Sequence, residues 1–221
     1  RARRLVSLRG LHRWAKRSGL AASDPTRTAD APRFRRRVRA VLSPEQVAAI
    51  LATCDNSWFG LRDRALIELT YSAGLRCSEV LGVNLSHLSL AESEGEVHVT
   101  GKGSIEAAVP FGASAATALR AWLAVRGEEP GALFLSRLNR RLSERTFRVM
   151  LAERGRRAGI PPRVHPHALR HACASHMHAG GADAFVIQEL LRHRHINTTL
   201  IHTRVTRTRI RDTRRRSHPR G

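Results

Sequence analysis

Four basic side chains have types and spacings that suit the chemistry of a phosphate group. His167 and Arg170 lie three residues apart, so on a helix they share one face. An arginine offers a planar fork of donors to two phosphate oxygens, and a histidine adds a hydrogen bond or transfers a proton. Arg76 follows a predicted helix end at Gly74, and Lys102 stands between two glycines at a predicted turn. Together they predict a site for phosphoryl chemistry.

Each of these residues also has a plainer explanation when taken alone. A histidine and an arginine at this spacing are common on exposed helix faces, and a lysine between glycines is an ordinary turn residue. An arginine beside a helix C-terminus stabilises the helix dipole. The hypothesis therefore depends on the elements that bring the four residues together.

The apolar spacing predicts a mostly helical chain with one small antiparallel sheet, an α+β fold class. Ser43, Pro44 and Gln46 form a strong helix start, with an N-cap, a proline in the first turn and a capping box. Residues 96–110 alternate apolar and polar and predict a β-hairpin with Lys102 at its tip. Helices are predicted over residues 3–19, 43–53, 60–73, 78–81, 113–126, 143–158, 166–179, 183–191 and 197–205.

The charge of the chain is concentrated at its two ends. The formal net charge is +21 over 221 residues. Residues 1–43 carry 13 basic and 2 acidic side chains, and residues 206–221 carry 7 and 1. Such an excess excludes an acidic solvating protein and predicts a polyanionic partner. The runs Arg35-Arg36-Arg37 and Arg214-Arg215-Arg216 predict contacts to phosphates.

Several classes of protein are excluded by composition. No run approaches the roughly 18 apolar residues of a membrane span, so we expect no membrane partner. Cys54, Cys77 and Cys173 lie far apart, which excludes a disulfide framework and a four-cysteine zinc site. This cysteine usage predicts a reducing, cytoplasmic location.

The candidate residues occur in blocks whose order resembles the tyrosine recombinases, and among them the Xer type. The blocks are Ser-Ala-Gly-Leu-Arg-Cys-Ser-Glu at Arg76, Thr-Gly-Lys-Gly at Lys102, Pro-His-Ala-Leu-Arg-His-Ala at His167 and Arg170, and Gln-Glu-Leu-Leu-Arg-His at His193. The resemblance covers residues 43–220 and implies the fold of the recombinase catalytic domain. It further implies that residues 1–19 are a remnant of the last helix of a core-binding (SAM-like) domain, 20–42 a basic linker, 43–205 the catalytic domain and 206–221 a basic tail.

The resemblance implies an activity on double-stranded DNA. The family breaks and rejoins DNA without a metal or other cofactor, through a tyrosine that forms a 3′-phosphotyrosyl link. Arg76 and Arg170 would converge on one basic cleft and clamp the phosphate, Lys102 would protonate the leaving 5′-oxygen, and His167 and His193 would assist. Family members work as tetramers on DNA, which implies a nucleoid location and roles in recombination, integration or chromosome partition. The expected DNA-binding residues are Arg35, Arg36, Arg37, Lys102, Arg204 and Arg207.

The nucleophile position departs from the family pattern. The family tyrosine lies nine residues after the histidine matching His193, and here that position is His202. The one tyrosine of the chain, Tyr71, lies on the apolar stripe of its predicted helix and is predicted to be core. Imidazole would form a phosphoramidate and reaches differently from a phenol oxygen, and a misplacement of about 1 Å can cost on the order of a hundredfold in rate. The expectation is a DNA-binding protein that does not cleave.

Two further departures accompany the missing tyrosine. Arg192 stands where the family usually has glycine before the histidine, and an arginine in a left-handed conformation would cost about 1 kcal/mol. Ser104, Ile105 and Ala107 make the hairpin less basic than is usual in the family, which weakens its expected DNA contact.

Three alternatives stay open at the level of sequence. An active recombinase that uses His202, or a tyrosine from a partner subunit, would form a covalent DNA adduct. A metal-dependent hydrolase built on His167 and His171, four residues apart, would bind stoichiometric zinc. An arginine-rich RNA-binding or scaffold protein would bind RNA more tightly than duplex DNA.

Overall fold

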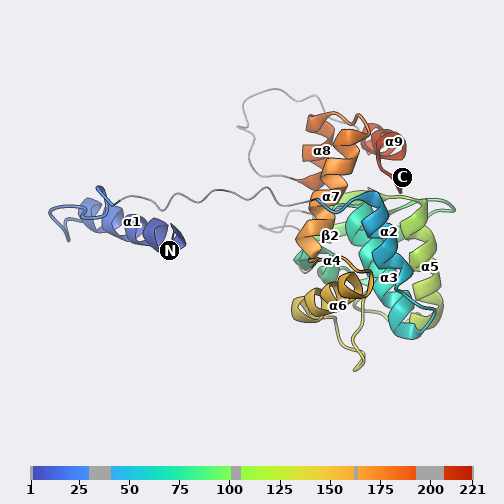
Figure 1. Cartoon of the computed structure of the whole chain (residues 1–221). Helices are drawn as coiled ribbons and strands as arrows, with labels where there is room; N and C mark the ends of the chain where they lie inside the picture. Colours follow the sequence, from blue (N-terminus) through green and yellow to red (C-terminus); the bar gives the residue numbers. More distant parts are fainter. Residues whose placement is uncertain (1, 30–40, 101–105, 162–163, 193–206, 221) are drawn as a thin grey trace. The chain divides into compact units, whose positions relative to one another are not determined.

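The computed structural model describes residues 2–29, 41–100, 106–161, 164–192 and 207–220. The chain divides into two compact units, Arg1–Ala40 and Val41–Gly221. The first unit holds α1 (Ala2–Arg17), drawn in dark blue in Figure 1. Arg9 of this helix donates to the backbone oxygens of Thr26 and Ala29, which brings the segment after α1 back against the helix.

The second unit contains the rest of the described elements. Three of its described α-helices precede the small sheet in the sequence and five follow it. The elements are α2 (Pro44–Ala52), α3 (Trp58–Ser72), α4 (Cys77–Gly82), the 3-10 turn η1 (Leu85–His87), β1 (Leu88–Leu90), β2 (Gly95–Thr100), β3 (Glu106–Phe111), α5 (Ala113–Arg126), α6 (Glu144–Arg157), α7 (Pro166–Ala179), α8 (Ala184–Leu191) and α9 (Arg207–Ser217). The predicted fold class, mostly helical with a small antiparallel sheet, is confirmed.

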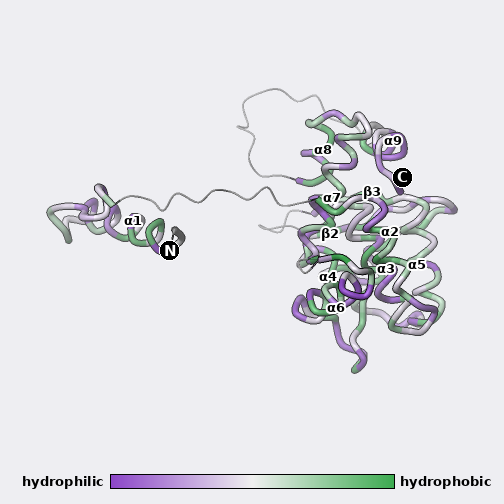
Figure 2. Tube along the Cα trace, in the orientation of Figure 1, coloured by the Kyte–Doolittle hydropathy of each residue, from purple (hydrophilic) through white to green (hydrophobic). Residues whose placement is uncertain are grey.

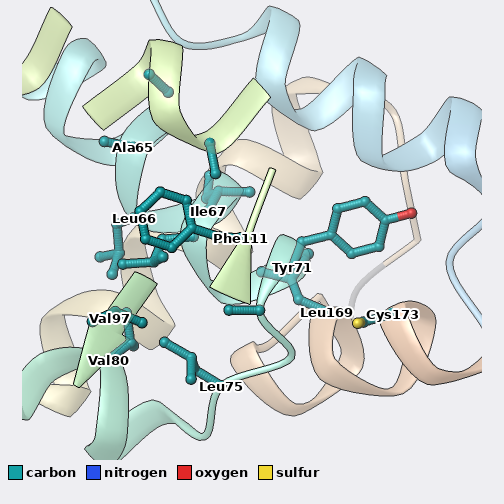
Figure 3. Close-up of a cluster of buried hydrophobic side chains, with 14 of the residues drawn as sticks. Ala65, Leu66, Ile67, Tyr71, Leu75, Val80, Val97, Phe111, Leu169 and Cys173 are labelled. Atoms are coloured by element: carbon teal, nitrogen blue, oxygen red, sulfur yellow. The ribbon is translucent and has the colours of Figure 1, made fainter. Parts of the chain in front are cut away.

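Helix α3 forms the centre of this unit, because most of its circumference is buried. Its residues Ala65, Leu66 and Ile67 are completely buried, and the helix packs against both α5 and α7. Figure 3 shows these side chains meeting Phe111 of β3, with Tyr71 further along the same helix. A helix that is buried on nearly all sides is a core helix. The burial of α3 therefore fixes the position of its C-terminal end, from which the chain leads to Arg76.

The sheet is antiparallel with the order β1-β2-β3. Val97 of β2 pairs with Val109 of β3, and both are buried. His98, the next residue along β2 after Val97, is exposed. This alternation is the period of two that the sequence predicts for residues 96–110. The sequence does not predict strand β1, since three residues carry no recognisable period. The hairpin tip, with Lys102, lies outside the described residues.

The predicted helix boundaries agree closely with the structure because local capping sets them. Ser43 accepts from the backbone N–H of Gln46, and the Gln46 side chain accepts from the backbone N–H of Ser43, so the predicted capping box is present. Gly74, with φ +59°, ends the α3 segment in the left-handed conformation that glycine tolerates. A Cβ at Gly74 would also lie 2.5 Å from the Leu191 side chain, so glycine permits close approach of α8.

Helix α9 corrects one prediction made from the charge runs. Figure 2 colours this helix largely as hydrophilic, and the sequence predicts phosphate contacts for Arg214. Arg214 is instead fully buried and donates to both the backbone oxygen and the hydroxyl of Ser72 on α3. Arg220, which follows α9, forms an ion pair with the buried Glu68 of α3. These arginines anchor the C-terminal segment, because a buried guanidinium needs acceptors within the protein.

Within the described part of the chain, no helix is long and apolar enough to cross a membrane.

Candidate functional site

Arg76 is placed by the turn that follows α3 and by the helix that begins after it. It is the N-cap of α4, and its side chain is 42% exposed. Its backbone N–H donates to Glu79 Oε2 at 2.7 Å, and its Nη1 donates to Glu79 Oε1 at 2.6 Å. Glu79 is buried and lies three residues along α4, so one carboxylate fixes both the backbone and the guanidinium of Arg76. The third contact of Arg76 is from Nη2 to the backbone oxygen of Arg192, at 3.1 Å.

Arg170 reaches the same carboxylate from α7. Its Nη1 lies 3.9 Å from Glu79 Oε2 and donates to the backbone oxygen of Gly74 at 2.5 Å, while its Nη2 donates to the backbone oxygen of Leu191. It is 3% exposed. Burial, with the nearby charge of Arg76, lowers the pKa of Arg170 to about 10, which still leaves it charged at neutral pH. The structure therefore brings Arg76 and Arg170 together, although 94 positions separate them in the sequence.

Arg192 completes the group that we call the Glu79 cluster (Arg76, Glu79, Arg170 and Arg192). Its Nη2 donates to Glu79 Oε2 at 2.6 Å. Burial alone would raise the pKa of Glu79, but the hydrogen bond from the Arg76 backbone and the charges of Arg192 and Arg76 outweigh burial and lower it. Burial lowers the pKa of Arg192, and the charge of Glu79 partly offsets this. The cluster thus holds three cations against one ionised carboxylate.

His167 lies in the first turn of α7 and is exposed. His165 is the N-cap of this helix, and its Nδ1 accepts from the backbone N–H of Ala168 at 3.1 Å. The rings of His165 and His167 are parallel, with centroids 6.3 Å apart. His167 and Arg170 lie about one turn apart on α7. The buried contacts of Arg170 to Gly74 and Leu191 therefore also fix the position of the turn that carries His167.

The remaining predicted site residues do not all fall within the described chain. Seven of them lie outside the described residues: Lys102, His193, His202, Arg35, Arg36, Arg37 and Arg204. The helix predicted over 197–205 also lies outside them. For Arg207 the description covers the backbone alone, as the first residue of α9.

Two residues of the cluster are not predicted as site residues by the sequence. Glu79 has a local signal, since a carboxylate three residues after Arg76 at a helix start indicates a capping contact. For Arg192 the sequence shows only a departure from the family pattern. Its pairing with Glu79 spans 113 positions, and no local pattern predicts it.

Tyr71 is core, as the sequence predicts. It is completely buried, and its hydroxyl lies 2.6 Å from Nδ1 of His176. Its ring also lies against His218, with centroids 4.6 Å apart. Burial raises the pKa of Tyr71 above its usual range, with a smaller contribution from Cys173. In Figure 3 its hydroxyl points away from the labelled apolar cluster, and Leu169 and Cys173 lie beside the ring.

The helical pair His167 and His171 is the metal site that the sequence leaves open. Among the described residues, no group of three or more His, Cys, Asp or Glu side chains could hold a metal ion. Cys54, Cys77 and Cys173 are free thiols.

A protein-family profile matches most of the second unit. The profile described as the Phage integrase family matches residues 40–209. The chain is similar to the tyrosine recombinase XerC of Yersinia pestis, 38% identical over 205 residues, covering 91% of this chain and 67% of the relative. It is also similar to the tyrosine recombinase XerD of Pseudomonas aeruginosa, 39% identical over 227 residues, covering 100% of this chain and 76% of the relative.

Solved structures agree with this comparison. The integrase from mycobacterium phage Brujita superposes with a TM-score of 0.68 at 26% identity, covering 99% of this chain and 73% of that one. A lambda integrase (75-356) dimer bound to a COC' core site gives a TM-score of 0.68 at 19% identity, covering 91% and 74%. The second likeness, at this identity, concerns the fold alone.

Proposed function

This chain belongs to the phage integrase family, and we propose that it is a DNA-binding protein of the Xer tyrosine recombinase type that holds a backbone phosphate with Arg76 and Arg170. The observation that carries the proposal is the convergence of these two arginines on Glu79. Each guanidinium is fixed by hydrogen bonds to the protein before any ligand arrives. Fixed donors aimed at one place stabilise charge on a phosphate without the cost of reorganisation.

The two arginines have different parts in this proposal. Arg76 is 42% exposed and is the one able to contact a phosphate at the surface. Arg170 is buried below it and supplies positive charge and position through Gly74 and Leu191. His167, exposed on the first turn of α7, would add a hydrogen bond to the same phosphate. Lys102 and His193 would serve as the family resemblance implies, as proton donor and as assisting residue.

We further propose that the chain does not cleave DNA by itself. The nucleophile position is His202, and the one tyrosine, Tyr71, is completely buried with its hydroxyl bonded to His176. A buried phenol with a raised pKa is a poor nucleophile, since the reactive phenolate is disfavoured. Cleavage would then need His202 or a tyrosine from a partner subunit.

Assembly and location follow from the same proposal. A recombinase of this type would act on double-stranded DNA as an oligomer, with a tetramer as the complete assembly, and would be found with the nucleoid in the cytoplasm. Lambda integrase has been solved as a tetramer bound to a Holliday junction, with a fold similar to this chain. Residues 1–19 would be the last helix of a core-binding domain that helps to grip the DNA.

A covalent-adduct assay tests the proposal. The native protein and its His202→Tyr variant are incubated with a pool of nicked suicide duplexes that carry candidate core sites, and adducts are separated on a denaturing gel. We expect an adduct from His202→Tyr and none from the native chain. The matched control is the double variant His202→Tyr, Arg76→Ala, which we expect to lose the adduct because the phosphate is no longer held. An adduct from the native chain would show that it cleaves DNA.

A further inference from the structure

Arg192 has a backbone conformation that is unfavourable for an arginine. It ends α8 with φ 51° and ψ 52°, in the left-handed region. Its backbone N–H is held by the oxygens of Gln188 and Glu189. A side chain with a Cβ is strained in this region, and such strain at a site is a reason to look for a function of that side chain. Since glycine would end the helix without strain, the guanidinium itself needs an explanation.

Neutralising Glu79 does not explain Arg192. Both oxygens of Glu79 already accept from Arg76, at 2.7 Å from the backbone N–H and 2.6 Å from Nη1. Arg192 adds a second donor to Oε2 at 2.6 Å, and Arg170 approaches the same oxygen. The cluster therefore has two positive charges more than its single carboxylate can balance. Guanidinium groups that share one carboxylate repel one another, so the cluster favours a further anion.

The hydrogen bonding of Arg192 is also incomplete. Its Nε and Nη1 are buried and have no hydrogen-bond partner among the described residues, while the side chain as a whole is 21% exposed. A buried donor without an acceptor costs free energy, and each such donor in a folded protein calls for an explanation. The forks that match two oxygens of a phosphate are Nε with Nη2 and Nη1 with Nη2. In Arg192 the shared member of both forks, Nη2, is bonded to Glu79.

We propose that Arg192 is a second phosphate-contacting arginine of this site, which binds the DNA backbone beside Arg76. This inference rests on the proposed function. When the guanidinium turns from Glu79 toward the exposed side of the cluster, Nη2 is released. It would then donate to the phosphate together with one of the unpaired nitrogens, Nε or Nη1. Arg76 stays anchored meanwhile, because Glu79 keeps its two hydrogen bonds from that residue. The strained backbone is then the cost of placing a second guanidinium on the phosphate beside Arg76.

The test measures how DNA affinity depends on salt. A labelled 30-base-pair duplex of mixed sequence is titrated with the full chain and with Arg192→Gly at several KCl concentrations. Each phosphate contact contributes about 0.9 to the slope of log K against log salt. We expect Arg192→Gly to lower the slope by about 0.9 and the affinity on the order of tenfold. Arg192→Lys keeps the charge and should keep the slope.

Two controls separate this role from a structural one. Asn139→Gly relieves the other non-glycine residue with positive φ in the described chain and should leave DNA binding unchanged. Arg76→Ala tests the underlying function. An unchanged slope in Arg192→Gly with a lower slope in Arg76→Ala would overturn the role of Arg192 and leave the proposed function standing. Unchanged slopes in both would overturn the two together.

A second arm distinguishes DNA from free phosphate as the ligand. Inorganic phosphate is added to the native chain and to Arg192→Gly without DNA, and the melting temperature is followed, since a ligand of the folded state raises it. A phosphate-induced rise that is lost in Arg192→Gly, with an unchanged DNA slope, would overturn the contact to DNA and indicate a site for free phosphate.

Discussion

At the scale of single residues, burial decides what a reactive side chain does in this protein. Tyr71 and Arg214 belong to the residue types expected at a DNA-cleaving site, yet both are completely buried. Arg76 is of the same type as Arg214 but remains 42% exposed. The hydroxyl of Tyr71 pairs with His176, and Nε and Nη2 of Arg214 bond to Ser72, so these groups are used within the core. Of these three side chains, Arg76 alone combines a fixed position with access to a ligand.

The hydroxyl of Tyr71 should contribute to stability and not to chemistry. Tyr71→Phe removes the hydrogen bond to Nδ1 of His176 and should lower the free energy of unfolding by about 1 kcal/mol. Urea denaturation measures the change. In the His202→Tyr background, Tyr71→Phe should leave the yield of covalent adduct unchanged. Loss of that adduct would mean that Tyr71 takes part in the reaction.

At the scale of elements, the cluster exists because α4 begins and α8 ends beside α7. Arg76 caps the start of α4, α7 carries Arg170, and Arg192 caps the end of α8. Arg170 bonds the backbone oxygens of Gly74 and Leu191, so α7 fastens the segment after α3 to the end of α8. Helix α9 also packs against α7 and is held by the buried Arg214. The positions of the arginines therefore depend on helix packing.

The docking of α9 should weaken in mild acid. His218 follows α9 and is buried among Tyr71, His176, Arg214 and Arg220; burial, with the charge of Arg214, lowers its pKa to about 3. The unfolded chain takes up this proton near its ordinary pKa of 6.5, and the folded chain only near 3. Stability is therefore constant above about pH 6.5 and falls as the pH drops toward 3. From pH 7 to pH 5 the loss from this group is about 2 kcal/mol.

The His218→Asn variant isolates this effect. The asparagine side chain can still accept from the backbone N–H of Arg220, as Nδ1 of His218 does, but it does not titrate. Unfolding free energies at the two pH values should differ less in the variant than in the native chain, by about 2 kcal/mol. The burial of His176 lowers its pKa in the same direction, so part of the pH dependence should remain. Equal pH dependence in the two proteins would contradict the assignment to His218.

At the scale of the whole molecule, folding and charge are distributed differently along the chain. The buried apolar core extends from Leu42 to Leu191, entirely within the second unit. The charge, in contrast, is concentrated in residues 1–43 and 206–221, and part of the second group is used internally by Arg214 and Arg220. The amino-terminal segment therefore holds most of the charge that is available for long-range attraction to DNA.

Removal of residues 1–40 should separate binding from folding. The fragment 41–221 retains the whole core and should unfold at nearly the same urea concentration as the full chain. Its affinity for duplex DNA should be lower and less dependent on salt, by about 0.9 in slope for each phosphate that is no longer bound, those of Arg35, Arg36 and Arg37 included. Circular dichroism and salt-dependent anisotropy measure the two properties. An unchanged slope would mean that these arginines do not bind phosphates.

Much of the fold follows from local signals that are visible in the sequence. The capping box at Ser43, the glycine after α3 and the alternation of β2 and β3 each depend on residues within a few positions of one another. Such signals set element type and boundaries, because caps, turns and periodicity act locally. The short strand β1 and the docking of α9 cannot be predicted in this way, since each depends on partners outside its own segment.

The sequence by itself determined the family blocks, the core position of Tyr71 and the basic ends of the chain, and it alone carries the proposal that His202 stands at the nucleophile position. Only the tertiary structure decided which arginines are free for a ligand. Arg214 lies within a run that indicates phosphate contacts but is buried against Ser72, and Arg192 pairs with Glu79 across 113 positions. The physical reason is that burial and charge pairing are properties of helices packed together, and a run of like charges carries no information about which members will be covered.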